Sequence, residues 1–156
     1  GTILNDQIKT LLSRGNFHIN FSLDSLQKDC YEYIRKNAVF EKTMAHLEYF
    51  YTFAKKNNRT LCLVTNPMRM NWREMPRFLE LANQLDIPLW FNTIIRPENL
   101  SLWALPKKDL QEIFTVLSTY RFQSVGENEY QKQHNIRMYN NLVCTQIKNW
   151  LDEAEQ

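Results

Sequence analysis

Three strand-like segments recur along the chain, and each is followed by a loop and an amphipathic helical stripe. Residues 17–24 alternate strictly between apolar and polar side chains, residues 61–65 are a nearly continuous apolar run, and residues 88–94 form the third segment. Alternation predicts a strand with one apolar face, whereas a continuous apolar run predicts a strand buried on both faces. The helical stripes follow at about 40–56, 76–85 and 106–120. Because a strand–helix repeat implies parallel strands joined by right-handed crossovers, the sequence predicts an α/β fold.

The segment after this repeat has a different pattern. Residues 121–135 are polar and predict a connector, and residues 136–152 carry the spaced apolar side chains of one amphipathic helix. We therefore expect one domain built from residues 1–120. Residues 121–156 are an appendage that is too short to form a second domain.

Composition argues against several classes of function. The net charge is only +2, and the basic residues do not cluster as they do in nucleic-acid binders. No apolar run reaches the roughly 20 residues that span a bilayer, so no membrane association is expected. The three cysteines, Cys30, Cys62 and Cys144, lie far apart and lack the spacing of metal ligands. This pattern predicts a reduced, cytoplasmic chain without a metal site of its own.

Polar side chains gather where the predicted strands end. In parallel α/β folds, ligands bind on the loops that leave the carboxyl ends of the strands. These loops carry Ser22, Asp24 and Ser25 after the first strand, Thr65 and Asn66 after the second, and Asn92, Thr93 and Arg96 after the third. Such residues also form turns and caps, so a purely structural role stays open. Asn71 and Glu74 have the spacing of a helix capping box, and no nucleophile–base pair is visible in these clusters.

Taken in order, several short motifs resemble the middle of a radical S-adenosylmethionine (radical SAM) enzyme barrel. They are Gly-Thr-Ile-Leu at 1–4, Ile-Asn-Phe-Ser-Leu-Asp-Ser at 19–25, Tyr-Glu-x-Ile-Arg-Lys at 31–36, Asn-Pro-Met-Arg-x-Asn-Trp-x-Glu at 66–74, Phe-Asn-Thr at 91–93 and Pro-Glu-x-Leu-Ser-Leu at 97–102. The likeness is closest to the peptide-modifying branch with SPASM or twitch C-terminal regions. It implies that residues 1–120 form a partial (βα) barrel, corresponding to strands four to six of the family.

The resemblance also implies cofactors and site residues. Family members hold a [4Fe–4S] cluster on a Cys-x-x-x-Cys-x-x-Cys loop, and the cluster cleaves S-adenosylmethionine to a 5′-deoxyadenosyl radical. This chain lacks the loop, so we expect the C-terminal part of a longer enzyme, inert without the missing N-terminal half of the barrel. S-adenosylmethionine and the cluster are expected in the parent enzyme, and neither is expected to stay bound to this chain alone. By the family pattern, Ser22 would bind the cofactor ribose, Arg35 the methionine carboxylate and Ile94 the adenine. Asn66, Asn92 and Asp24 complete the expected set, with Asp24 shaping its loop or facing a peptide or small-molecule substrate.

Two further questions follow from the partial barrel. The chain can instead be a non-enzymatic α/β module that serves as a binding or scaffolding subunit. The strand at 17–24 would then, as in the enzyme fragment, lie at an open edge of the sheet that needs a cover. The helix at 136–152 is one candidate cover, and a second copy of the chain is the other. We expect the homodimer, because a helix covers a sheet face more readily than it satisfies the hydrogen bonds of a strand.

Overall fold

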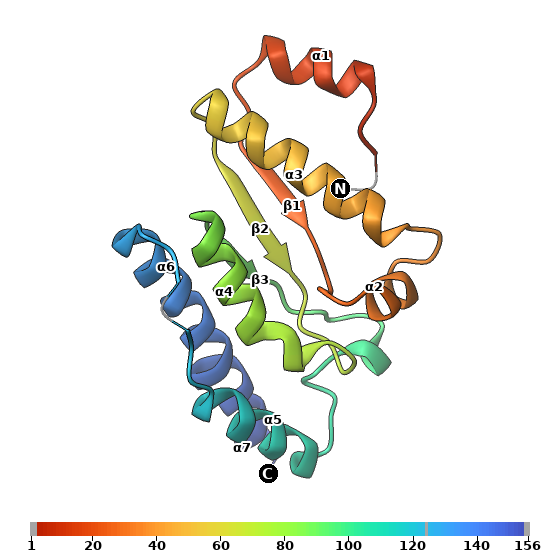
Figure 1. Cartoon of the computed structure of the whole chain (residues 1–156). Coiled ribbons are helices and arrows are strands. Elements are labelled where there is room, and N and C mark those ends of the chain that lie inside the picture. Colours follow the sequence, from red (N-terminus) through yellow and green to blue (C-terminus); the bar gives the residue numbers. More distant parts are fainter. Residues whose placement is uncertain (1–2, 124, 155–156) are drawn as a thin grey trace.

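The computed structural model describes residues 3–123 and 125–154, and it shows helices packed on a small sheet (Figure 1). In chain order the elements are α1 (Asp6–Arg14), β1 (Ile19–Ser22), α2 (Lys28–Ile34), α3 (Phe40–Lys56), β2 (Leu61–Thr65), η1 (Trp72–Glu74), α4 (Met75–Leu85), β3 (Leu89–Phe91), η2 (Glu98–Leu100), α5 (Lys107–Thr119), α6 (Glu129–Asn140), η3 (Asn141–Ile147) and α7 (Lys148–Glu153). Of these, η1 and η2 are 3-10 helices, and η3 is a π-helix. The predicted α/β class is confirmed.

The three strands are parallel and lie in the order β1-β2-β3. All three fall within the predicted segments, but β1 and β3 are shorter than predicted. The third strand ends early because β2 ends at Thr65. The Asn92 N–H still donates to the Thr65 carbonyl over 3.0 Å, and no strand formed by the described residues lies beside the residues that follow.

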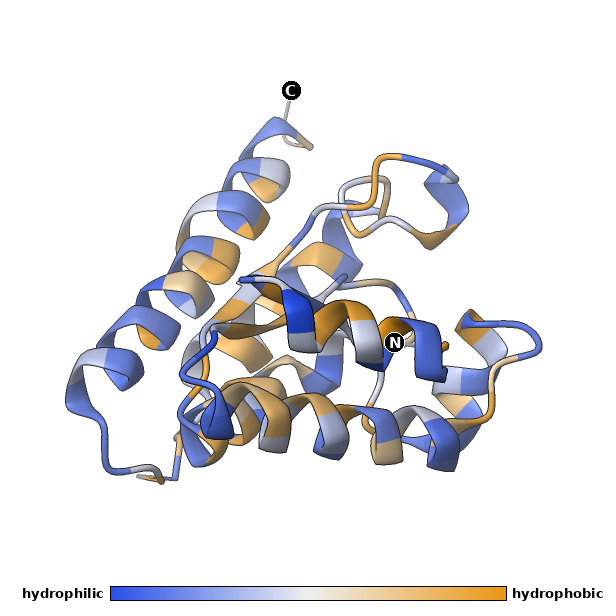
Figure 2. Ribbon diagram, turned by 90° about the horizontal axis from the view of Figure 1, so that it is seen from above, coloured by the Kyte–Doolittle hydropathy of each residue, from blue (hydrophilic) through white to orange (hydrophobic). Residues whose placement is uncertain are grey.

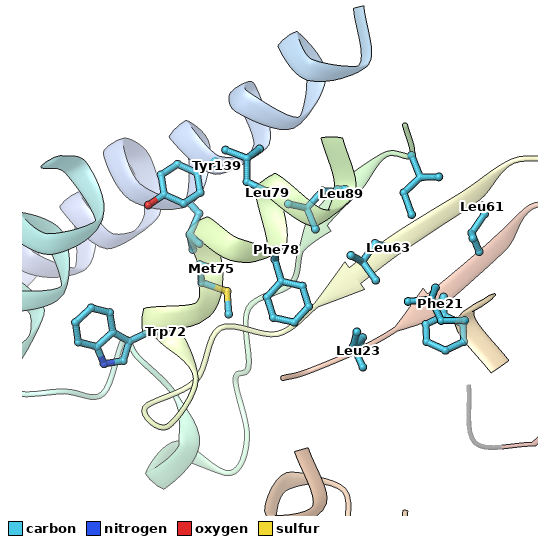
Figure 3. Packing of buried hydrophobic residues seen from close by; sticks show 14 of the residues in the cluster. Phe21, Leu23, Leu61, Leu63, Trp72, Met75, Phe78, Leu79, Leu89 and Tyr139 are labelled. Atoms are coloured by element: carbon cyan, nitrogen blue, oxygen red, sulfur yellow. The ribbon is translucent and has the colours of Figure 1, made fainter. Parts of the chain in front are cut away.

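One face of the sheet is packed, and the other is partly exposed. Phe21, Leu63 and Leu89 are at most 1% exposed and belong to the core that α3 and α4 complete (Figure 3). Register partners point to the same side of a sheet. Asn20 pairs with Cys62, and Trp90 pairs with Val64, which lies two residues further along β2 on the same side. Asn20 and Trp90 therefore both lie on the opposite face. Asn20 is exposed there, and Trp90 is 44% exposed.

The C-terminal helical stretch runs from α6 through η3 to α7 and packs against α4, α5 and β3. It begins at Glu129, because the Asn128 side chain accepts a hydrogen bond of 3.1 Å from the Gln131 N–H. The predicted connector at 121–135 is therefore wrong in its second half, which is helical. Figure 2 shows this stretch with polar residues on its outer side and apolar residues toward the rest of the molecule.

This helical stretch covers the β3 edge of the sheet, so the prediction that it could cover strand 17–24 is wrong. The Asn135 side chain accepts a hydrogen bond of 2.8 Å from the Leu89 N–H of β3. It also donates to the Ile87 carbonyl over 3.1 Å and to Asn83 Oδ1 over 2.9 Å. The homodimer stays a prediction.

Candidate functional site

The polar cluster at the carboxyl ends of β1 and β2 centres on Asp24, which is 1% exposed. Parallel strands bring their carboxyl ends to one edge of the sheet, so the loops after β1 and β2 meet there. Asn66 Nδ2 donates to Asp24 Oδ1 over 2.6 Å, and the Asn66 main-chain N–H reaches the same oxygen over 3.3 Å. The structure thus brings together two of the predicted site residues.

Arg35 joins this cluster from the end of α2, where it is the C-terminal cap residue. Its Nε donates to Asp24 Oδ2 over 2.6 Å. The Asp24 side chain is 2% exposed, whereas that of Arg35 is 44% exposed. A carboxylate buried this deeply needs a compensating charge, and Arg35 supplies it. Within the described residues, no hydrogen bond occupies the two terminal nitrogens of Arg35.

Asn71 fixes the main chain of both loops and is fully buried. Its Nδ2 donates to the Asp24 carbonyl over 2.5 Å and to the Asn66 carbonyl over 2.9 Å, while its Oδ1 accepts from the Met68 N–H over 2.6 Å. No side-chain cap bond forms at Asn71. The predicted capping box is therefore wrong, because these long-range partners use the amide instead.

Glu74, the other half of that predicted box, bonds the loop after β1. Ser25 Oγ donates to Glu74 Oε1 over 2.8 Å, and the Leu26 N–H donates to Glu74 Oε2 over 2.6 Å. Glu74 is 4% exposed, so its charge is held by these donors rather than by water. Asn71 and Glu74 together clamp the loop that carries Asp24. The sequence signal for them was present, but it was assigned to a local cap.

The remaining predicted residues lie outside this hydrogen-bonded cluster. Ser22 is the last residue of β1, half-buried, and its register partner is Val64. Asn92 is exposed after β3. Ile94 is half-buried, and its carbonyl accepts from Trp103 Nε1 over 3.1 Å. The structure therefore does not bring Asn92 or Ile94 into contact with Asp24 through any hydrogen bond between described residues.

A residue far away in sequence reaches the loop after β3. Thr93 Oγ1 donates to Gln146 Oε1 over 3.1 Å, and Gln146 belongs to the π-helix η3. π-Helical turns occur frequently at functional sites. Sequence patterns could not identify Gln146, because nothing local links it to the strand ends.

The reactive side chains are dispersed. Burial raises the pKa of the Cys30 thiol in α2 and of the Cys62 thiol in β2, while Cys144 is exposed in η3. Among residues 3–123 and 125–154, no three His, Cys, Asp or Glu side chains form a group that could hold a metal ion. In the same part of the chain, no helix combines the length and apolar character needed to cross a membrane.

An apolar groove of about 550 Å³ lies elsewhere, between α3 and α4. Phe40, Met44 and Leu81 are among its lining residues, and none of the strand-end cluster contributes to it.

The strand-end cluster itself offers charge-assisted and neutral hydrogen bonds, which suit recognition of a polar, carboxylate-bearing ligand. The sequence matches no protein-family model and no curated protein, and no solved structure matches the fold.

Proposed function

We propose that this chain forms the S-adenosylmethionine- and substrate-binding part of a radical SAM enzyme, folded as three βα units of a partial (βα) barrel. The observation that carries the proposal is Arg35. It is anchored by Asp24 at the carboxyl edge of the sheet and keeps its terminal nitrogens unoccupied among the described residues. Guanidinium nitrogens bind carboxylates in pairs, and the methionine part of S-adenosylmethionine ends in a carboxylate.

The two faces of the sheet also support a barrel. One face is packed by α3 and α4, and the other carries the polar side chains of Asn20 and Ser22, with His134 of α6 contacting Trp90 at its β3 end. In a (βα) barrel the helix-free face lines the interior, and ligands bind at the carboxyl ends of the strands. Ser22 stands at such an end, as the resemblance implies for the residue that binds the ribose. The open edge of β1 would pair with the preceding barrel strand.

The iron–sulfur cluster does not fit the residues of this chain. In the family, a bound [4Fe–4S] cluster supplies the electron that cleaves S-adenosylmethionine. Cys30, Cys62 and Cys144 lie on a helix, a strand and a π-helix, and no metal-binding group forms among the described residues. We therefore propose that the cluster belongs to the barrel half that pairs with β1, and that this chain acts only as the binding part.

A non-enzymatic binding or scaffolding module is the second candidate. It is favoured by the completeness of the cluster, since Asp24 satisfies both its oxygens with Arg35 and Asn66. In this reading the cluster only shapes the loops, and the exposed sheet face binds another protein.

Titration of the chain with S-adenosylmethionine, followed by amide NMR shifts, separates the two candidates. The first predicts saturable shifts at Ser22, Arg35 and Asn66. Arg35→Ala should then weaken binding about tenfold to a hundredfold, the equivalent of roughly 1.5–3 kcal/mol for a hydrogen bond to a charged group. The matched control is Arg121→Ala, which removes an exposed arginine outside the cluster and should leave binding unchanged. No shifts up to millimolar ligand, in a folded protein, would favour the scaffolding module.

A further inference from the structure

The ion pair between Asp24 and Arg35 uses only one nitrogen of the guanidinium. Arg35 donates through Nε, so its Nη1 and Nη2 groups remain for another acceptor. Asp24 is fixed more firmly than Arg35, because it is buried and its other oxygen is bonded to Asn66. Its carbonyl is also held by Asn71. The pair therefore has a rigid side inside the protein and a half-exposed side that faces solvent.

We propose that Asp24 is a positioning residue that aims the terminal nitrogens of Arg35 at the carboxylate of the ligand. The proposal rests on the proposed function for the identity of that ligand, S-adenosylmethionine. A free arginine side chain has many rotamers, and ordering them opposes binding. Asp24 imposes this order before the ligand arrives, so the ligand meets a preorganised pair of donors.

The burial of Asp24 decides whether the ligand adds to the ion pair or replaces it. If the ligand displaced Asp24, a carboxylate with a side chain 2% exposed would lose its only charged partner among the described residues. Leaving one member of a buried ion pair alone is strongly unfavourable. The ligand carboxylate therefore binds Nη1 and Nη2 while Nε stays on Asp24.

A pair of ligands that differ only in the carboxylate tests this role. S-adenosylmethionine and decarboxylated S-adenosylmethionine are titrated by NMR into the unmodified chain, Asp24→Asn, Arg35→Ala and the double variant. Asp24→Asn should weaken S-adenosylmethionine about fivefold to thirtyfold, the effect of losing one ordered long side chain. It should leave the decarboxylated ligand nearly unchanged. In the double variant, the loss should not exceed that of Arg35→Ala alone.

Several results would overturn the positioning role. Equal weakening of both ligands by Asp24→Asn, or additive losses in the double variant, would show that Asp24 does not act through Arg35. Tighter binding of S-adenosylmethionine by Asp24→Asn would show that Asp24 competes with the ligand. If the unmodified chain binds neither ligand, the proposed function itself is wrong, and the positioning role is wrong with it.

A second variant carries the test if Asp24→Asn does not fold. Arg35→Lys keeps the positive charge at this half-exposed position. A lysine ammonium, however, has a single nitrogen, so it cannot bind Asp24 and also present two further nitrogens side by side to the ligand carboxylate. It should lose most of the preference for S-adenosylmethionine over the decarboxylated ligand. A preference as large as that of the unmodified chain would overturn the proposal.

Discussion

The two edges of the sheet are completed in different ways. At the β3 edge, Asn135 accepts a hydrogen bond from the Leu89 N–H and donates to the Ile87 carbonyl, so the helical stretch satisfies main-chain groups there. At the other edge, β1 bonds to β2 on one side, and no described residue forms a strand on its outer side. The chain itself therefore covers the β3 edge, whereas the β1 edge is open to another strand.

The open edge lacks several of the features that keep an edge strand from pairing with another strand. Natural edge strands are protected by proline, lysine, bulges, a covering helix or shortness, and β1 is short, with four residues. The segment 17–24 contains neither proline nor lysine, and the helical stretch lies at the opposite edge. The difference between the edges teaches that β1, unlike β3, has a side on which another strand can pair, as the proposed barrel and the predicted homodimer both require.

The largest expected effect is on the free energy of unfolding, through the β3 edge of the sheet. Asn135→Ala should destabilise the fold by about 2–4 kcal/mol, because it leaves the buried Leu89 N–H and Ile87 carbonyl without partners. Gln133→Ala is the control, since Gln133 is exposed on the same helix and bonds only the Glu129 side chain. It should change the free energy of unfolding by less than about 0.5 kcal/mol. Urea denaturation measures both, and equal effects would mean that Asn135 does not complete this edge.

A smaller effect is expected on the pH dependence of stability, through a histidine at the same edge. Burial lowers the pKa of His134, with the positive charge of Arg137 adding to it, and the His134 ring packs edge-on against Trp90 at 5.2 Å. Below about pH 6.5, His134 binds a proton more readily in the unfolded chain than in the folded chain. Stability should therefore fall as the pH drops from about 6.5 toward the lowered pKa, by at most about 1.4 kcal/mol per pH unit.

His134→Gln should flatten this dependence, and unfolding at pH 7 and pH 5 measures it. The control is Asn140→Ala, which changes an exposed, uncharged residue at the end of the same helix and should leave the slope as it is. A slope that is unchanged in His134→Gln would show that His134 stays equally protonated in the folded and unfolded chains.

Much of the fold followed from sequence patterns, and the parts that did not depend on distant contacts. The alternation at 17–24 and the apolar run at 61–65 predicted two strands, because burial on one or two faces leaves a periodic trace. The strand-end rule selected Asp24 and Asn66, and the family resemblance selected Arg35.

The missed residues have partners that no local pattern reveals. Glu74 and Asn71 fit a capping box, yet they bond Ser25, Leu26 and the Asp24 carbonyl, which lie 47 to 49 positions away in the sequence. Asn135 lies in a polar stretch that predicted a connector, although it is fully buried. A single polar residue leaves no periodic signal, so its role at the β3 edge becomes visible only once the strand and the helix are side by side.

Residue-resolved hydrogen exchange tests the difference between the two edges most directly. The account predicts slow exchange for the Leu89 amide, which bonds Asn135, and for the Leu23 amide, which bonds the Val64 carbonyl over 2.9 Å. The Asn20 and Ser22 amides, whose N–H groups point outward from β1, should exchange fast in dilute protein. Slowing of these two amides with rising protein concentration would reveal pairing with a second copy. Asn20 and Ser22 amides as slow as that of Leu89 at every concentration would contradict an open β1 edge.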